Sequence, residues 1–331
     1  MDSPGRWNLR RLYHRLRLRN TQNPSLTSFW PQMREGVRRA LRDIDPDVIH
    51  AHFGPSGVRI APVARSLDIP LVVTFYGSDL SAKAEIEFWL EKYRNLWPQT
   101  DVVTVLSEEM KERAKGLGCP SSKLRVVHLC RDLEEFSFRP PKEPVQNILF
   151  VGRLVPKKAP LDAVRAVQLA NAQGTDLHLH IIGEGPLRES VSEYIKKEGL
   201  NKFTLHGRIP STEVGDHMQA ADAFILPSKV APNGDREGTP TVLIEAQAVG
   251  LPCVTTQHAG IPEMIPEHNC DLLSPEGDIE SMAEVLVKLA DASVDTLVRR
   301  AEHGRQKVEG AFNLSTEVKK LRKLYRAVAE K

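Results

Sequence analysis

Short apolar runs alternate with helix-like stretches along most of the chain, and this alternation limits its possible folds more than any other feature. Four runs bounded by Pro, Gly or Asp come first, at 47–53, 70–75, 101–106 and 124–129. Strands that alternate with helices predict an α/β fold with a parallel sheet. A Pro-rich break at 139–144 then interrupts both periodicities, as a linker between two domains does.

The alternation restarts beyond this break. Strands are predicted at 148–151, 177–182, 203–206, 223–226 and 252–255, and helices at 159–171, 187–198, 241–249 and 279–292. This order is typical of a doubly wound sheet, which binds its ligands at the carboxyl ends of its strands. An amphipathic helix is expected at 315–329.

These patterns divide the 331 residues into four expected parts. Residues 1–45 form a basic helical arm and residues 46–140 a first Rossmann-like domain. Residues 141–312 form a second Rossmann-like domain, which binds the ligand. Residues 313–331 form the closing helix, which is expected to cross back to the first domain.

Charge and cysteine usage exclude several classes of protein. The formal net charge is only +2, so electrostatics give no support to a nucleic-acid partner. The four cysteines lack the paired spacing of a zinc site or a disulfide framework, which fits a reducing cytoplasm. No apolar run is long enough for a spanning helix. Residues 1–42 hold ten arginines against Asp2 and Glu35, and this segment is a candidate for peripheral contact with anionic membrane.

The segment 235–250 carries the strongest functional pattern. Gly238 permits close approach of the backbone, Thr239 suits the N-cap of the following helix, and Pro240 suits its first turn. The free amides of Thr241 and Val242 would then face an anion such as a phosphate, which the helix dipole favours.

Two carboxylates and two cations surround this predicted anion site. Glu237 precedes the helix, and Glu245 lies roughly 7 Å along the helix axis, so the two can address opposite ends of one ligand. Carboxylates accept hydrogen bonds from the vicinal hydroxyls of sugars. Arg153 and Lys158 follow the strand at 148–151, where they can neutralise a diphosphate.

The pair Glu237/Glu245, with seven residues between, and the pair Arg153/Lys158, with four, resemble the motifs of glycosyltransferase family four. Further matches occur at 183–186, 206–208 and 259–263. The segment 73–79 and the insert 232–240 resemble transferases of bacterial exopolysaccharide assembly, such as colanic acid biosynthesis. The resemblance implies a GT-B fold of two Rossmann-like domains and transfer with retention at the anomeric carbon.

The resemblance also implies a role for each motif residue. Glu245 would hold the ribose hydroxyls, Glu237 the transferred sugar, and Arg153 with Lys158 the diphosphate. Backbone near Arg208 would receive the base. Transfer of this kind needs neither a metal nor a cofactor, because cationic side chains and amides stabilise the departing diphosphate.

In the first domain, three residues are candidates for contact with substrate. His50 and His52 share one face of a strand, since alternate residues do, and His52 lies near the strand end. Tyr76 stands where many relatives have histidine and can donate a hydrogen bond to a sugar oxygen. Asp79 follows Gly77 in the same loop.

The first domain is expected to be incomplete, because the strand and glycine-rich loop with which relatives begin have no counterpart before residue 47. The leading hypothesis is transfer of a hexose from a UDP- or GDP-sugar to a glycan or lipid-linked acceptor, in the cytoplasm or at the inner face of the membrane. The main alternative is a non-catalytic or partner-dependent module that binds the nucleotide sugar. A sugar-nucleotide epimerase or a glycosyl phosphorylase fits the two motif pairs less well.

Overall fold

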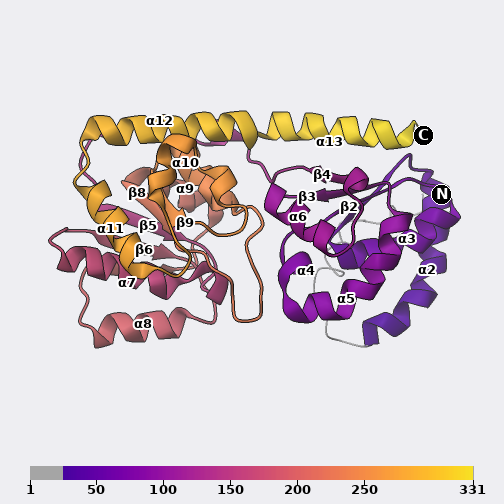
Figure 1. Ribbon diagram of the computed structural model, residues 1–331, viewed down its shortest axis with the longest axis horizontal. Coiled ribbons are helices and arrows are strands. Elements are labelled where there is room, and N and C mark those ends of the chain that lie inside the picture. The colour runs from indigo at the N-terminus through magenta and orange to yellow at the C-terminus, as the bar shows by residue number, and fades with distance from the viewer. Residues whose placement is uncertain (1–24, 331) are drawn as a thin grey trace, which may run out of the picture.

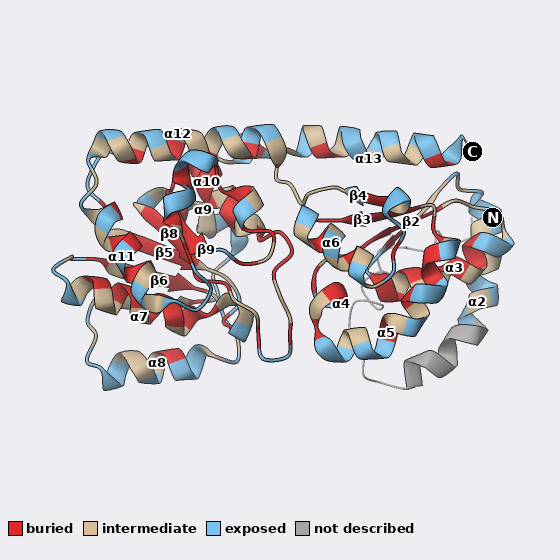
Figure 2. Ribbon diagram, viewed as in Figure 1, coloured by how far each residue is buried: buried red, intermediate tan, exposed pale blue. Residues whose placement is uncertain are grey.

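The computed structural model describes the backbone of residues 25–330 and the side chains of residues 33–330. The first part of the expected basic arm, residues 1–24, lies outside the described residues. Within the described range the chain forms two parallel sheets, each covered by helices and each built around its own apolar core (Figures 1 and 2). The predicted α/β class with parallel sheets is confirmed.

The first sheet contains four described strands in the order β1-β2-β3-β4, and each strand pairs in parallel with the next. The central strands β2 and β3 are buried along their whole length, and such strands read as continuous Val-rich runs instead of alternating ones. The strands are β1 (Ile49–His52), β2 (Leu71–Thr74), β3 (Val102–Val105) and β4 (Leu124–Val126). The helices of this unit are α2 (Ser25–Ile44), α3 (Gly54–Ser66), α4 (Ser78–Ser81), α5 (Lys83–Leu96) and α6 (Glu108–Gly116).

The second sheet contains six strands in the order β10-β9-β8-β5-β6-β7. The chain enters at the central β5, adds strands on one side and then returns to add the others, so the switch point lies between β5 and β8. Its strands are β5 (Asn147–Val151), β6 (His178–Ile182), β7 (Phe203–Gly207), β8 (Ala223–Leu226), β9 (Cys253–Thr256) and β10 (Leu273–Ser274). Its helices are α7 (Pro160–Ala172), α8 (Arg188–Lys197), α9 (Ser211–Ala220), α10 (Thr241–Val249), α11 (Ile279–Ala290) and α12 (Val294–Ala311).

Two helices in line run along both units at the top of Figure 1. α12 packs against α10 in the second unit, whereas α13 (Leu314–Ala329) lies on the first. The Tyr325 hydroxyl of α13 is 2.6 Å from His50 Nδ1, and Glu317 accepts a hydrogen bond of 2.9 Å from the His128 amide. α12 was not predicted from the sequence, because its polar composition and two glycines hide a narrow buried stripe, formed by Leu297, Ala301, Gly304 and Val308.

Direct contacts join the two units beside the predicted ligand site. The Glu263 carboxylate accepts hydrogen bonds from the amides of Glu108 (3.0 Å) and Glu109 (3.1 Å), and thereby caps α6 from the other unit. Gly260 packs so closely that a Cβ there would lie 2.6 Å from Ser107 Cβ. The loop after β9 is therefore positioned by both units. The loop after β8 is as well, because its Asn233 carbonyl accepts a hydrogen bond of 2.8 Å from the Lys83 amide of the first unit.

Among the described helices, none combines the length and the apolar character needed to cross a bilayer.

Candidate functional site

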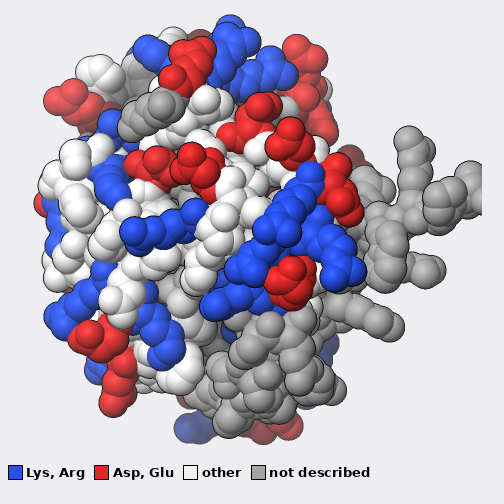
Figure 3. Space-filling view, turned by 90° about the vertical axis from the view of Figure 1, so that its right-hand side faces the viewer, with Lys and Arg blue, Asp and Glu red and all other residues white. Residues whose placement is uncertain are grey.

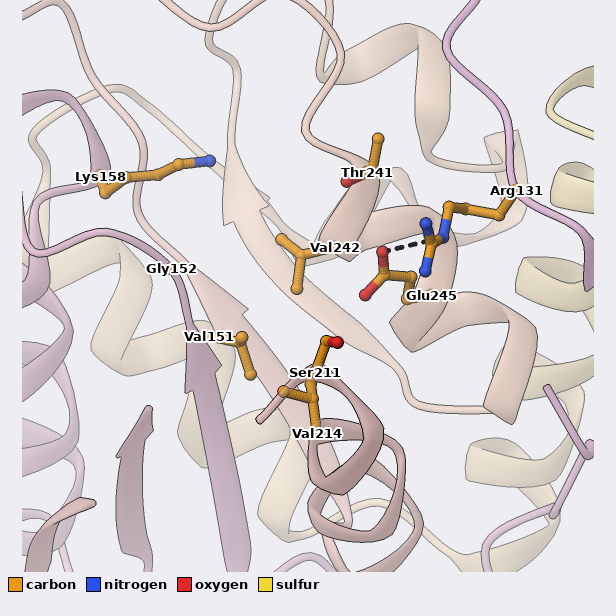
Figure 4. A pocket seen from close by; sticks show the side chains of 9 residues that line it. All are labelled: Arg131, Val151, Gly152, Lys158, Ser211, Val214, Thr241, Val242 and Glu245. Atoms are coloured by element: carbon orange, nitrogen blue, oxygen red, sulfur yellow. Dashed lines mark ion pairs between the residues drawn. The ribbon is translucent and has the colours of Figure 1, made fainter. Parts of the chain in front are cut away.

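A pocket of about 400 Å³ opens at the carboxyl end of β5, next to the switch point of the second sheet (Figure 4). Ligands of doubly wound sheets bind at this position. The pocket is lined by Arg131, Val151, Gly152, Lys158, Ser211, Val214, Thr241, Val242 and Glu245. Four of the residues proposed from sequence, Lys158, Thr241, Val242 and Glu245, thus come together.

The N-terminal end of α10 forms one wall of this pocket. The helix begins at Thr241, and its cap residue is Pro240, which makes no side-chain cap bond. Thr241 and Val242 therefore lie in the first turn, where amides of a helix lack partners within the helix and favour an anion. Gly250 ends α10 with a φ of 102°, a left-handed conformation that glycine adopts at little cost.

The N-cap role predicted for Thr239 is wrong. Its hydroxyl donates to the Leu106 carbonyl of the first unit at 2.9 Å, and the side chain is buried. The close approach expected at Gly238 is also made to the first unit, since a Cβ there would lie 2.9 Å from the Tyr76 carbonyl oxygen. Both residues dock the loop against the first unit and do not line the pocket.

Lys158, which lines the pocket, forms an ion pair of 2.9 Å with Glu237, which does not line it. Glu237 is only 5% exposed. Burial alone would raise the pKa of Glu237, but Lys158 and Lys157 outweigh it, so the pKa is lowered and the carboxylate stays charged. An ammonium has three N–H donors, so Lys158 can hold Glu237 and also reach a phosphate oxygen in the pocket.

Lys158 precedes a strained position. Ala159 adopts the left-handed conformation, with a φ of 47°, which glycine adopts more readily than alanine. This conformation costs about 1 kcal/mol for a residue with a Cβ. It bends the chain directly into α7.

Glu245 faces the pocket from α10, and its Oε1 lies 3.1 Å from Arg131 Nε. Burial raises the pKa of Glu245, and Arg131 offsets part of this rise. Figure 4 shows the guanidinium of Arg131 reaching the carboxylate from the segment after β4. Arg131 was not predicted from the sequence, because nothing local to it indicates that the end of the first sheet lies beside α10.

Ser211 and Val214 of α9 complete the wall opposite α10 and were also missed. The only signal for them was the match at 206–208, which places a helix start after that segment. Arg153, Arg208 and Glu237, which the sequence also indicated, lie outside the pocket lining: the two arginines are exposed, and Glu237 is buried.

The candidate residues of the first unit form a separate polar cluster. His52 Nδ1 lies 2.5 Å from the Tyr76 hydroxyl, and the His52 ring stacks on His50 with centroids 4.4 Å apart. Burial lowers the pKa of His52, and burial together with His52 lowers the pKa of His50 to about 4. Both imidazoles are therefore neutral near pH 7. His52 is exposed and remains accessible to a substrate.

Asp79 serves the backbone and not a ligand, contrary to expectation. Its buried carboxylate accepts hydrogen bonds from the amides of Gly54, Tyr76 and Gly77, at distances of 2.9–3.0 Å. Burial raises the pKa of Asp79 to about 6 despite these bonds. Asp79 thus holds the loop that carries Tyr76.

Known proteins match the chain along nearly its whole length. A family model described as glycosyl transferases group 1 matches residues 132–307, which include every residue of the pocket lining except Arg131, and one described as glycosyltransferase family 4 matches residues 2–135. The chain belongs to the group 1 glycosyltransferases. The fold is GT-B, as the sequence analysis expected, and the two predicted motif pairs lie within this family match.

Two relatives come from the synthesis of bacterial exopolysaccharides. WcaL of Escherichia coli K12, a glycosyltransferase assigned to colanic acid biosynthesis, is 33% identical over 288 residues, which cover 85% of this chain and 71% of WcaL. The amylovoran biosynthesis glycosyltransferase AmsK of Erwinia amylovora is 32% identical, over 86% of this chain and 70% of its own. The structure of Anabaena Alr3699/HepE in complex with UDP and glucose superposes with a TM-score of 0.75 at 17% identity, over 91% of this chain and 82% of that one.

Proposed function

We propose that this glycosyltransferase moves a hexose from a UDP- or GDP-sugar to a glycan or lipid-linked acceptor in exopolysaccharide synthesis, with retention at the anomeric carbon. The observation that carries the proposal is the pocket at the switch point. It places the first turn of α10, Lys158 and Glu245 around one cavity of about 400 Å³. Such a set suits a ligand with a diphosphate in the middle and hydroxyl groups at both ends.

Each group of the donor has a partner in this arrangement. The diphosphate lies against the first turn of α10, near Thr241 and Val242, with Lys158 as its cation. The ribose hydroxyls bond Glu245, and in doing so they take the place of Arg131 on that carboxylate. The hexose lies toward Glu237, on the side of the first unit. HepE, with its bound UDP and glucose, supports this class of ligand.

Transfer then follows from the position of the diphosphate. The bond between the anomeric carbon and the phosphate oxygen breaks, and the acceptor oxygen bonds that carbon on the same face. The departing diphosphate accepts the proton of the acceptor hydroxyl. Lys158 and the amides of α10 stabilise the growing negative charge, and we propose that this proceeds without a metal.

The test is calorimetric titration of the chain with UDP, GDP and their hexose conjugates, followed by assays of donor hydrolysis and transfer with and without EDTA. We expect one nucleotide to bind at micromolar concentration and its sugar conjugate to be turned over with or without EDTA. The anomeric configuration of the product is read by NMR. Binding without turnover by the intact chain would favour the alternative of a binding module, and no binding of any nucleotide sugar would contradict both.

We further propose that the end of the molecule formed by α2 contacts anionic membrane from the cytoplasmic side, where a lipid-linked acceptor would be met. α2 exposes Arg39 and Arg42, and Figure 3 shows groups of Lys and Arg side chains over this end. Each such cation near an anionic surface contributes about 1 kcal/mol at moderate salt.

Arg39→Glu combined with Arg42→Glu should reduce cosedimentation with phosphatidylglycerol vesicles by more than about tenfold at low salt. The matched control makes the same charge change at Lys196 and Lys197, which are exposed on α8 at the far end of the molecule. Equal loss in both pairs would show that only net charge matters. No loss in either pair would contradict the proposal.

A further inference from the structure

His258 lies in the loop after β9 with its side chain fully buried, and both of its ring nitrogens have partners. The backbone amide of Glu237 lies 3.1 Å from His258 Nε2. On the other side of the ring, Nδ1 lies 2.8 Å from Glu276 Oε2. The imidazole therefore stands between a carboxylate and the backbone of the residue that we assign to the transferred sugar.

These contacts fix the tautomer of His258. An amide N–H can only donate, so Nε2 must be the unprotonated acceptor and the proton lies on Nδ1, facing Glu276. The second oxygen of Glu276 accepts a hydrogen bond of 2.5 Å from the Val230 amide. The Glu276 carboxylate and the His258 imidazole thus hold the loop between β8 and α10 at two points, Val230 and Glu237.

The side chain of Glu237 depends on this anchor. Its carboxylate is bonded by Lys158 at 2.9 Å and lies 3.4 Å from Ser228 Oγ, while the backbone amide of the same residue is held by His258. Loss of His258 would leave a buried amide without a partner, and the loop would shift to satisfy it. Such a shift moves the carboxylate at the sugar end of the site, whereas, among the described residues, neither a hydrogen bond nor an ion pair joins His258 to Glu245 or α10 at the nucleotide end.

We infer that His258 and Glu276 are positioning residues that orient Glu237 toward the transferred sugar and so govern recognition of the hexose half of the donor. The inference rests on the proposed function. It separates the site into a nucleotide half, held by α10 and Glu245, and a sugar half, held through His258.

The test compares two ligands in each variant: the nucleoside diphosphate that the wild type binds, UDP or GDP, and its hexose conjugate. His258→Phe should leave the dissociation constant of the diphosphate within about twofold of wild type. It should lower turnover of the sugar conjugate by about tenfold to a hundredfold, as loss of an orienting partner does elsewhere. His258→Gln, whose side-chain oxygen can still accept a hydrogen bond from the Glu237 amide, should lose less of this turnover. His268→Gln, at an exposed histidine, is the matched control.

A double-mutant cycle distinguishes action through Glu237 from general damage. In a Glu237→Ala background, His258→Gln should cause no further loss of turnover, because the group that it positions is gone. If His258→Phe does not fold, Glu276→Gln and His258→Gln keep the shape of the site and decide the question in the same assays.

Three results would overturn the inference. One is wild-type turnover in His258→Phe, His258→Gln and Glu276→Gln, which would leave the proposed function standing. Another is equal loss of affinity for the diphosphate and its sugar conjugate, which would show a structural role only. The third is a wild type that binds no nucleotide sugar, which would remove the proposed function as well.

Discussion

Lys158→Met is expected to lower donor turnover by about a hundredfold or more and to lower the free energy of unfolding by about 3 kcal/mol. The substitution leaves Glu237 as an unpaired carboxylate at 5% exposure, and a buried charge without its partner is costly. It also removes the cation assigned to the departing diphosphate. Loss of such a cation lowers turnover by about a hundredfold or more. Urea denaturation and a donor hydrolysis assay measure the two effects.

The double variant Lys158→Met/Glu237→Gln separates these effects. Because it removes both charges, it should recover most of the lost stability but none of the activity. Lys111→Met, which breaks an exposed pair with Glu108, should change stability by less than about 1 kcal/mol. Recovery of turnover in the double variant would show that Lys158 acts only on Glu237 and not on the diphosphate.

Glu245→Ala is expected to weaken binding of the nucleotide by about a hundredfold while leaving the fold intact. A carboxylate that accepts two hydrogen bonds from a ribose contributes about 3 kcal/mol, which corresponds to this change in the dissociation constant. The loss should be the same for the free diphosphate and for the nucleotide sugar, since Glu245 lies at the nucleotide end. Calorimetric titration measures both constants.

The matched control is Glu284→Ala, which removes an exposed carboxylate of α11 outside the pocket. It should bind both ligands like wild type. A Glu245→Ala variant with wild-type affinity would place the ribose elsewhere in the pocket. In the wild type, Arg131 would then remain paired with Glu245 when the donor is bound.

Much of the fold could be predicted from sequence, because the decisive signals are local. Buried Val-rich runs identify β2 and β3. Gly250 marks the end of α10, because the left-handed conformation that ends the helix favours glycine. The failures were also physical. α12 was missed because its buried stripe is narrow, and the cap role of Thr239 was wrong because its hydroxyl bonds the first unit instead.

The α/β class, the parallel order of the second sheet and the residues of the two motif pairs could be predicted from the chain alone. Periodicity, caps and short spacings act within one element, so they can be read without knowing what the element touches. The same patterns indicated Lys158, Thr241, Val242 and Glu245, which the structure brings together in the lining of one pocket.

The partners of these residues, in contrast, depend on how the two units fold and pack together. Arg131 reaches Glu245 because the end of the first sheet lies beside α10, and Gly238 and Thr239 are used in docking because the two units pack there. His258 accepts a hydrogen bond from the amide of Glu237, although the two residues lie in different loops. No spacing in the sequence indicates this contact. Contacts of this kind depend on how whole elements pack, and packing is set by the shapes of both surfaces at once.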